Sequence, residues 1–198
     1  MGLGSGDVYA ICYWIMIALW GLLEVFGASP RRQASSRRDA LRKDRGSYIL
    51  LVASLFLGIF LGGLLTEYAM YANIDWNRPA IMILAISVMA AGIVFRQYAI
   101  HVLGRYFTVD VAVSADQRVV QEGPYHWIRH PAYTGTLIIV IGMGLGMLNW
   151  LSMTAILAGY FIGHLYRIQV EEHALLESIG QPYRDYCQRT KRLIPKIF

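Results

Sequence analysis

Long apolar stretches alternate with short polar connections along most of this chain. A helix needs about 20 apolar residues to cross the hydrocarbon core of a bilayer, and five stretches approach or reach that length. They cover residues 8–27, 48–65, 79–100, 133–148 and 151–168. Pro79 suits the first turn of the third helix, where its missing N–H leaves no hydrogen bond unmade. The pattern predicts an all-α integral membrane protein with five transmembrane helices.

Composition supports this prediction and argues against an ordinary soluble domain. Hydrophobic residues make up 56% of the 198 residues and charged residues only 16%, whereas soluble domains carry about 25% charged residues. The first stretch has no basic segment before it and no small-residue cleavage site after it, so we expect a retained span and not a signal peptide. Cys12 and Cys187 lie at opposite ends of the chain, and we expect neither a disulfide nor a metal site from them.

Basic residues fall on alternate connections between the predicted spans. One side carries Arg78 alone. The other side carries Arg31, Arg32, Arg37, Arg38, Arg42, Lys43, Arg45, Arg105, Arg118, Arg129, Arg167, Arg184, Arg189, Lys191, Arg192 and Lys196. The positive-inside rule then predicts an external N-terminus and a cytoplasmic C-terminus, in the cell inner membrane if the source is prokaryotic.

The Arg-rich loop at 30–45 is explained by this topology, as a solvated positive segment. Recruitment of anionic lipid or of a partner is the alternative. A basic run without a recognition fold predicts no nucleic-acid binding, and the sequence indicates no obligate protein partner.

Small residues recur four apart within the spans, as Gly58 with Gly62, Gly142 with Gly146, and Gly159 with Gly163. Such pairs let helix backbones approach closely in lipid. The glycines at 142–146 resemble a nucleotide-binding loop only superficially, because no strand precedes them. We therefore expect these glycines to mark helix–helix contacts.

A polar cluster precedes the fourth stretch. Pro131 disfavours helix at His130 and suits the first position of the next helix, where free N–H groups favour an anion. Arg129 offers a planar fork that matches a carboxylate. Tyr125 and Trp127 alone are equally well explained as interfacial anchors. His126 and His130 are four apart, but the glutamate of the helical zinc motif is missing, so no metal is expected.

A second polar cluster, Arg167, Glu171 and Glu172, ends the fifth stretch. Arg167 and Glu171 share a helix face and can pair, whereas adjacent carboxylates point about 100° apart and cannot serve one site in the same way. Only Asn149 and Trp150 separate the last two stretches, so we expect a tight helical hairpin. Its two polar clusters then meet in one pocket on the cytoplasmic face. Tyr183 and Tyr186 in the tail are interpreted as amphipathic surface residues, or as residues that close over that pocket.

These residues together resemble the isoprenylcysteine carboxyl methyltransferase family in its short five-span prokaryotic form, which is related to phospholipid methyltransferases. The matching segments are Leu103-Gly104-Arg105-Tyr106-Phe107-Thr108, Glu122-Gly123-Pro124-Tyr125, Arg129-His130-Pro131-Ala132-Tyr133-Thr134-Gly135, Glu171-Glu172, Gly180, Tyr183, Tyr186 and Arg192-Leu193-Ile194-Pro195. The resemblance covers roughly the C-terminal half of the chain. We accordingly expect one membrane domain, 1–198, with three spans and the Arg-rich loop in residues 1–100 and a catalytic half in residues 101–198.

The resemblance implies S-adenosylmethionine as cofactor, with S-adenosylhomocysteine as product, and a lipophilic or prenylated acceptor taken from the membrane lipids. The implied cofactor-binding residues are Tyr125, Arg129, His130, Pro131, Tyr133, Glu171 and Glu172. Arg167 is the candidate for holding an acceptor carboxylate, with Arg105 the weaker choice, and Arg167 and Glu171 are the candidate catalytic residues. A carboxylate is already anionic and needs no general base, so alignment and exclusion of water would suffice. An amine acceptor would need one, and Glu171 or Glu172 would supply it.

Other functions remain open at this point. Phospholipid N-methylation is one, and a structural membrane protein without turnover is another. A third is an NADPH-dependent reductase resembling the membrane sterol reductases, which share a His-Pro-x-Tyr turn. In that pattern an asparagine follows the proline and a glutamate follows the glycine, whereas this chain has Ala132 and Thr136 there. The difference favours the methyltransferase.

Overall fold

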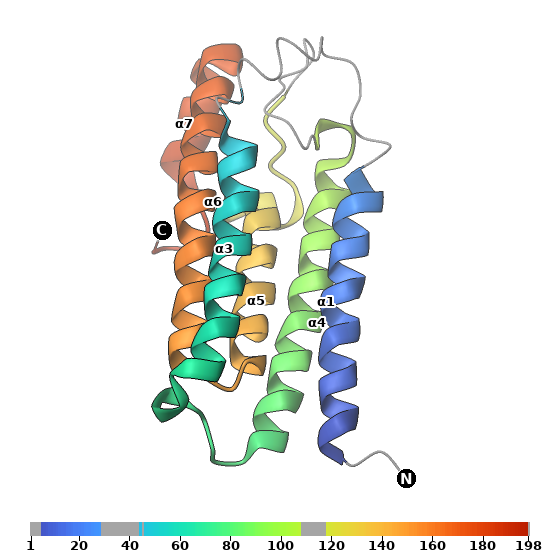
Figure 1. Ribbon diagram of the computed structural model, residues 1–198. Helices are drawn as coiled ribbons and strands as arrows, with labels where there is room; N and C mark the ends of the chain where they lie inside the picture. Colours follow the sequence, from blue (N-terminus) through green and yellow to red (C-terminus); the bar gives the residue numbers. More distant parts are fainter. Residues whose placement is uncertain (1–4, 29–43, 45, 108–117, 198) are drawn as a thin grey trace.

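The computed structural model describes residues 5–28, 44, 46–107 and 118–197, and these form helices joined by turns and short connections. The long helices are α1 (Ser5–Ala28), α3 (Ser47–Tyr68), α4 (Arg78–Leu103), α5 (Pro131–Gly146) and α6 (Trp150–Ile179). Shorter ones are η2 (Met70–Ala72), η3 (Gly104–Tyr106), η4 (Gly123–His126) and α7 (Gln181–Arg189). The long helices run up and down as one bundle, with α7 at one end (Figure 1). The all-α prediction is confirmed for these residues.

Four of the predicted apolar stretches each lie within one of the long helices, and the stretch 133–148 runs two residues past the end of α5 at Gly146. The largest difference is at α6, which continues past residue 168 to Ile179 because no helix breaker occurs before Gly180. Gly180 has φ +73°, a conformation that favours glycine and ends the helix. The Arg-rich loop at 30–45 lies outside the described residues except for Asp44, and Thr108 also lies outside them.

Three of the helices are long and apolar enough to cross a membrane, over Gly6–Val25, Ser47–Tyr68 and Arg78–Tyr106. α5 is apolar but has only 16 residues. α6 has 30 residues, but its apolar part contains the polar His164 and Arg167. Membrane character is therefore supported in the described part of the chain, and five crossings stay a prediction.

The helices pack in an order different from a simple hairpin. α3 lies along α6 and α4 lies along α5, while α5 and α6 contact each other less extensively and α1 packs on α4. Glycines make the close approaches possible. A Cβ on Gly159 would come 2.4 Å from the carbonyl oxygen of Ser54 in α3, and one on Gly142 would come 2.7 Å from that of Ala85 in α4. The expected role of these glycines in helix contacts is confirmed.

The α5–α6 turn is tight, as predicted, and it is anchored by Asn149. This side chain is fully buried and accepts a hydrogen bond from the Ser152 backbone N–H at 3.0 Å, which caps α6. Its Nδ2 donates to the carbonyl of Ala69 at 3.0 Å and to Oδ1 of Asn73 at 2.8 Å. The turn thereby holds the far end of the bundle together and leaves the start of α5 beside the later turns of α6.

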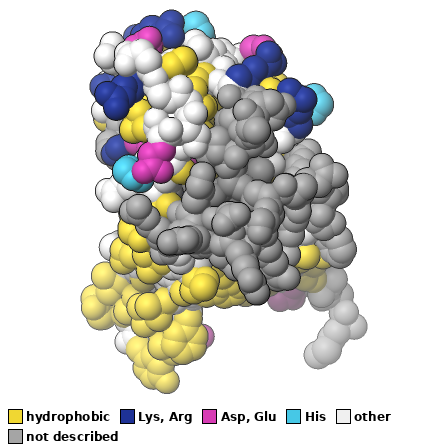
Figure 2. Space-filling model, turned by 90° about the horizontal axis from the view of Figure 1, so that it is seen from above, with side chains coloured by type: hydrophobic (Ala, Val, Ile, Leu, Met, Phe, Trp, Pro, Cys, Tyr) yellow, Lys and Arg dark blue, Asp and Glu magenta, His cyan; other side chains and the backbone are white. Residues whose placement is uncertain are grey.

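The polar side chains gather at the end of the bundle that carries α7. Figure 2 looks down on that end and shows Lys, Arg, Asp, Glu and His side chains together on one part of it, with hydrophobic side chains on another. The free thiols of Cys12 and Cys187 lie on α1 and α7.

Candidate functional site

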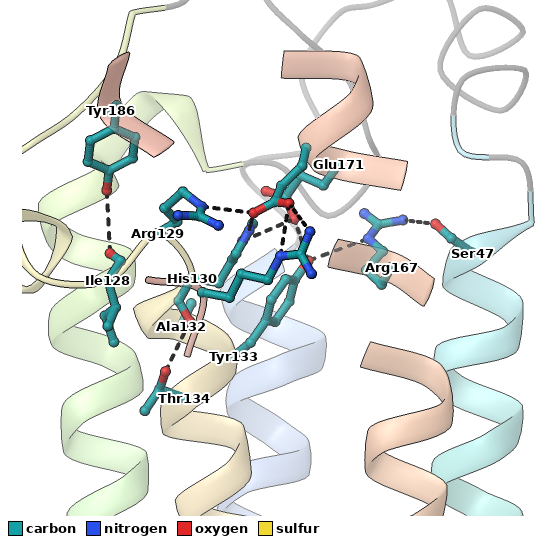
Figure 3. A network of polar contacts seen from close by, with 12 residues as sticks. Ser47, Ile128, Arg129, His130, Ala132, Tyr133, Thr134, Arg167, Glu171 and Tyr186 are labelled. Carbon is teal, nitrogen blue, oxygen red and sulfur yellow. Dashed lines mark hydrogen bonds and ion pairs between the residues drawn. The ribbon is translucent and has the colours of Figure 1, made fainter. Parts of the chain in front are cut away.

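The start of α5 and the later turns of α6 meet at this end (Figures 1 and 3). Pro131 is the first residue of α5, and His130 precedes it with non-helical backbone angles. Tyr133 is the third residue of α5 and faces Glu171 of α6. The expected meeting of the two polar clusters is therefore observed.

Glu172 is the centre of a buried ionic cluster. It accepts hydrogen bonds from Arg129 Nε at 2.8 Å and from Arg192 at 3.0 and 2.8 Å, and His130 Nε2 lies 3.3 Å away. Its side chain is only 9% exposed. Burial acts to raise the pKa of Glu172, but the hydrogen bonds from His130 and Arg192 and the charges around it outweigh burial and lower the pKa to about 2.

Glu171 has a different environment, although it is the next residue. Its carboxylate accepts a 2.8 Å hydrogen bond from Tyr133 and lies 3.8 Å from His130 Nδ1. The side chain remains 32% exposed. The His130 ring therefore lies between two carboxylates, one of which is buried and one accessible, in keeping with the expectation that adjacent glutamates cannot serve alike.

Arg129 also holds the C-terminal segment. Its Nη1 donates to the carbonyls of Cys187 at 3.2 Å and Thr190 at 2.5 Å. The backbone N–H groups of Arg129 and His130 donate to the carbonyls of Lys191 and Arg192 at 2.8 and 3.0 Å. The segment after α7 thus runs along the start of α5 and brings the guanidinium of Arg192 to Glu172.

Tyr183 and Tyr186 are buried, so their interpretation as surface residues is wrong. They point from α7 toward the bundle, and Tyr186 donates a 2.6 Å hydrogen bond to the carbonyl of Tyr125. Tyr125 is also buried, which excludes a surface anchoring role for it, whereas Trp127 is 61% exposed. Burial raises the pKa of Tyr125, Tyr183 and Tyr186, so all three phenols are neutral at physiological pH.

Arg167 is buried beside this cluster (Figure 3). Its Nη1 contacts the carboxylate of Asp44 and donates to Ser47 Oγ at 2.8 Å. Its Nε lies 3.4 Å from the hydroxyl of Tyr133, which in turn donates to Glu171. The hydroxyl of Tyr133 therefore lies between Arg167 and Glu171, the two residues that the sequence analysis expected to pair.

Arg105 lies elsewhere, in η3 after α4. It is exposed, and its Nη2 donates to the hydroxyl of Tyr106 at 2.8 Å while its guanidinium lies over that ring. Arg118 also lies near the same ring. Arg105 thus belongs to a group of residues on the connection between α4 and α5.

Two groups of residues escaped the sequence analysis. Asp44 was missed because it lies in a loop in which basic residues predominate. Glu24 and Arg96 were missed although ionisable groups within apolar stretches are unusual and mark important positions. Arg96 donates to Glu24 at 2.5 and 2.7 Å and to the carbonyl of Ala132 at 2.9 Å, and so ties α1 and α4 to the start of α5.

Comparison with known proteins agrees with this geometry. Residues 83–177, which contain both polar clusters, match the family model described as the isoprenylcysteine carboxyl methyltransferase (ICMT) family. The chain is 31% identical over 114 residues to protein-S-isoprenylcysteine O-methyltransferase B of Arabidopsis thaliana, which covers 57% of this chain and 58% of that protein. It is 34% identical over 116 residues to protein-S-isoprenylcysteine O-methyltransferase of Tribolium castaneum, covering 58% of this chain and 41% of that protein.

The fold is similar to a solved structure of the eukaryotic intramembrane Ras methyltransferase ICMT. The TM-score is 0.62 at 25% sequence identity, and the alignment covers 93% of this chain and 65% of that chain. The alignments to the two curated relatives span about half of their length. In the matched segment, the named relatives and the fold, the chain is similar to the isoprenylcysteine carboxyl methyltransferase family.

Proposed function

We propose that this chain is an integral membrane methyltransferase that uses S-adenosylmethionine and methylates a carboxylate on a lipid-like acceptor. The observation that carries the proposal is the meeting of Tyr133 and His130 with Glu171 and Arg167 at one end of a bundle of apolar helices. The names of the relatives support isoprenylcysteine-type O-methylation. Charged side chains beside apolar helices suit a polar cofactor and a lipophilic acceptor together.

The residues present suit the proposed cofactor. Glu171 is an acceptor-only carboxylate that is still 32% exposed, so it can receive the ammonium or ribose hydroxyls of a nucleoside amino acid. Tyr133 fixes the position of that carboxylate, and His130 lies between Glu171 and Glu172. S-adenosylmethionine, when bound, supplies an electrophilic methyl group on a sulfonium.

The buried residues around them have a supporting role in this proposal. Glu172 and Arg129 have internal partners, so we assign them to holding His130 and the C-terminal segment in place. Tyr125 and Pro131 shape the same region from η4 and the start of α5. This assignment narrows the expected cofactor contacts to His130, Tyr133 and Glu171.

Arg167 is the proposed partner of the acceptor carboxylate. Its guanidinium is planar and always charged, and it can bind a carboxylate with two parallel hydrogen bonds. A carboxylate is ionised at neutral pH, so the site needs no base for this acceptor. Arg167 would align the acceptor and the helices would exclude water.

The proposed topology has five crossings, with the site on the cytoplasmic side. α5 and the apolar part of α6 would be the fourth and fifth spans, packed against the longer α4 and α3. Arg78 lies at the end of the bundle opposite the site, where α4 begins (Figure 1). The distribution of basic residues then follows the positive-inside rule.

The test is ligand binding followed by transfer. S-adenosylhomocysteine should raise the thermal unfolding temperature of purified protein, since a ligand that binds only the folded state stabilises it. Glu171→Gln should abolish this shift, whereas Glu177→Gln, on the exposed side of the same helix, should keep it. Transfer is then measured to a prenylated cysteine, to its amide, and to phosphatidylethanolamine.

The proposal expects a shift with S-adenosylhomocysteine and transfer to the prenylated cysteine alone. Transfer to phosphatidylethanolamine would mean that the acceptor is an amine and not a carboxylate, with Glu171 as the candidate base. A thermal shift with NADPH and none with S-adenosylhomocysteine would indicate a reductase and contradict the proposed methyltransferase. No shift with either ligand would indicate a structural membrane protein without turnover.

A further inference from the structure

Asp44 lies just before α3 and outside the segment that matches the family model. Its carboxylate accepts hydrogen bonds from Ser47 Oγ at 2.9 Å and from the backbone N–H of Tyr48 at 3.1 Å. The second contact satisfies one of the N–H groups in the first turn of α3, which have no partner within the helix. Local contacts therefore hold this carboxylate in place.

The same carboxylate pairs with a residue far along the chain. Nη1 of Arg167 in α6 contacts Oδ1 of Asp44 and also donates to Ser47 Oγ. The side chains of Arg167 and Asp44 are only 4% and 6% exposed. A buried ion pair is costly to desolvate and is weak evidence for a stabilising role, so stability alone gives no reason for this one.

Another nitrogen of the guanidinium faces the candidate site. Nε of Arg167 lies 3.4 Å from the hydroxyl of Tyr133, and that hydroxyl donates to Glu171 at 2.8 Å. Because a guanidinium is planar and rigid, a contact that fixes Nη1 also sets the direction of Nε and of the whole fork. Figure 3 shows Arg167 between Ser47 and the Tyr133–Glu171 pair.

We infer that Asp44 is a positioning residue for acceptor binding, which acts through Arg167 and touches neither substrate. It balances the buried positive charge and holds the fork toward Tyr133. This inference rests on the proposed function, because it assigns Asp44 to the acceptor side of the reaction. It also makes the start of α3 part of the site, although this helix lies outside the matched segment.

The kinetic test uses Asp44→Asn. Asparagine still accepts a hydrogen bond from the Tyr48 N–H but has no charge for Arg167. We expect kcat/KM for the prenylated cysteine to fall at least about tenfold, while the Kd for S-adenosylhomocysteine changes less than about threefold. Asp44→Glu, which keeps the charge, should recover part of the loss. The control is Thr66→Val, which removes the Thr66–Ser152 contact between α3 and α6 near the opposite end and should leave both constants unchanged.

A second measurement tests the pairing without turnover. Asp44→Asn, Arg167→Met and the double variant are compared by thermal unfolding. If Asp44 serves Arg167, the double variant should lose no more stability than the less stable single variant. Additive losses, an unchanged kcat/KM in Asp44→Asn, or equal losses of acceptor and cofactor affinity would overturn the inference. A wild type that transfers no methyl group would refute the proposed function, and the unfolding comparison would then decide whether Asp44 positions Arg167.

Discussion

At the scale of single residues, the two adjacent glutamates show how position on a helix separates roles. Glu172 faces Arg129, Arg192 and His130 and is buried, whereas Glu171 faces Tyr133 and stays accessible. Both residues are glutamates, and they differ only in the direction in which their side chains leave the helix axis. We therefore propose a structural role for Glu172 and ligand contact for Glu171.

This difference predicts opposite outcomes for the same substitution. Glu172→Gln removes the negative charge from a buried cluster of cations and should cost about 3 kcal/mol of unfolding free energy. Glu171→Gln should cost less than about 1 kcal/mol of unfolding free energy but should weaken the binding of S-adenosylhomocysteine at least about tenfold. Chemical unfolding and calorimetric titration on the two variants measure these effects. Similar stability of both variants would contradict the assignment.

The lowered pKa of Glu172 predicts how stability depends on pH. In the folded protein this pKa is about 2, below its ordinary value of 4.5. The stabilisation is then complete above about pH 4.5 and declines as the pH falls toward 2, because the unfolded chain binds the proton first. The total is on the order of 3 kcal/mol. Between pH 7 and pH 3, the unfolding temperature of the wild type should fall more steeply than that of Glu172→Gln. Parallel curves for the two proteins would contradict the stabilising role of the Glu172 charge.

The positions of some site residues followed from the sequence and others did not. Pro131 marks the start of α5 by its chemistry alone, and the short turn at Asn149 brings His130 to Glu171. Asp44 could not be placed in this way, because 123 positions separate it from Arg167. Only the packing of α3 against α6 brings the two together, and no local pattern encodes that contact.

At the scale of helices, glycines set the distances between neighbours. The spacing of Gly58, Gly142, Gly159 and their partners predicted close contacts, but not which helices would meet. The structure pairs α3 with α6 and α4 with α5, so the hairpin predicted from the short turn is held mainly by helices from earlier in the chain. The N-terminal half thus supports the polar clusters of the C-terminal half.

Gly159→Ala should therefore destabilise the bundle. The added Cβ would lie 2.4 Å from the Ser54 carbonyl oxygen and 3.1 Å from Gly58 Cα, which are backbone atoms that cannot rotate away. We expect a loss of about 1–3 kcal/mol from overpacking. Gly63→Ala in α3 is the matched control, since a Cβ there has no neighbour within 4 Å and should stabilise the helix by up to about 1 kcal/mol. Equal effects of the two substitutions in thermal unfolding would refute this account of the packing.

At the scale of the whole molecule, the ends of the bundle differ in chemistry. The cluster around Glu172, the pair of Arg167 with Asp44 and the helix α7 share one end, while the α3–α4 and α5–α6 connections share the other (Figure 1). The alternation of basic residues predicted this division from the sequence. Hydropathy alone did not predict how far α6 extends, because the helix continues through polar residues into the site.

The division of the ends predicts which residues are accessible from each side of the membrane. Tyr71 lies on the α3–α4 connection and is 87% exposed, and Gln188 is exposed on α7. In a variant with Cys12 and Cys187 replaced by serine, Tyr71→Cys should react with an impermeant maleimide in intact cells, because the positive-inside rule puts Arg78 outside. Gln188→Cys should react only after permeabilisation. The opposite pattern would invert the topology and separate the site from cytoplasmic S-adenosylmethionine. Labelling of both residues in intact cells would require an even number of crossings between Tyr71 and Gln188 in place of the three proposed.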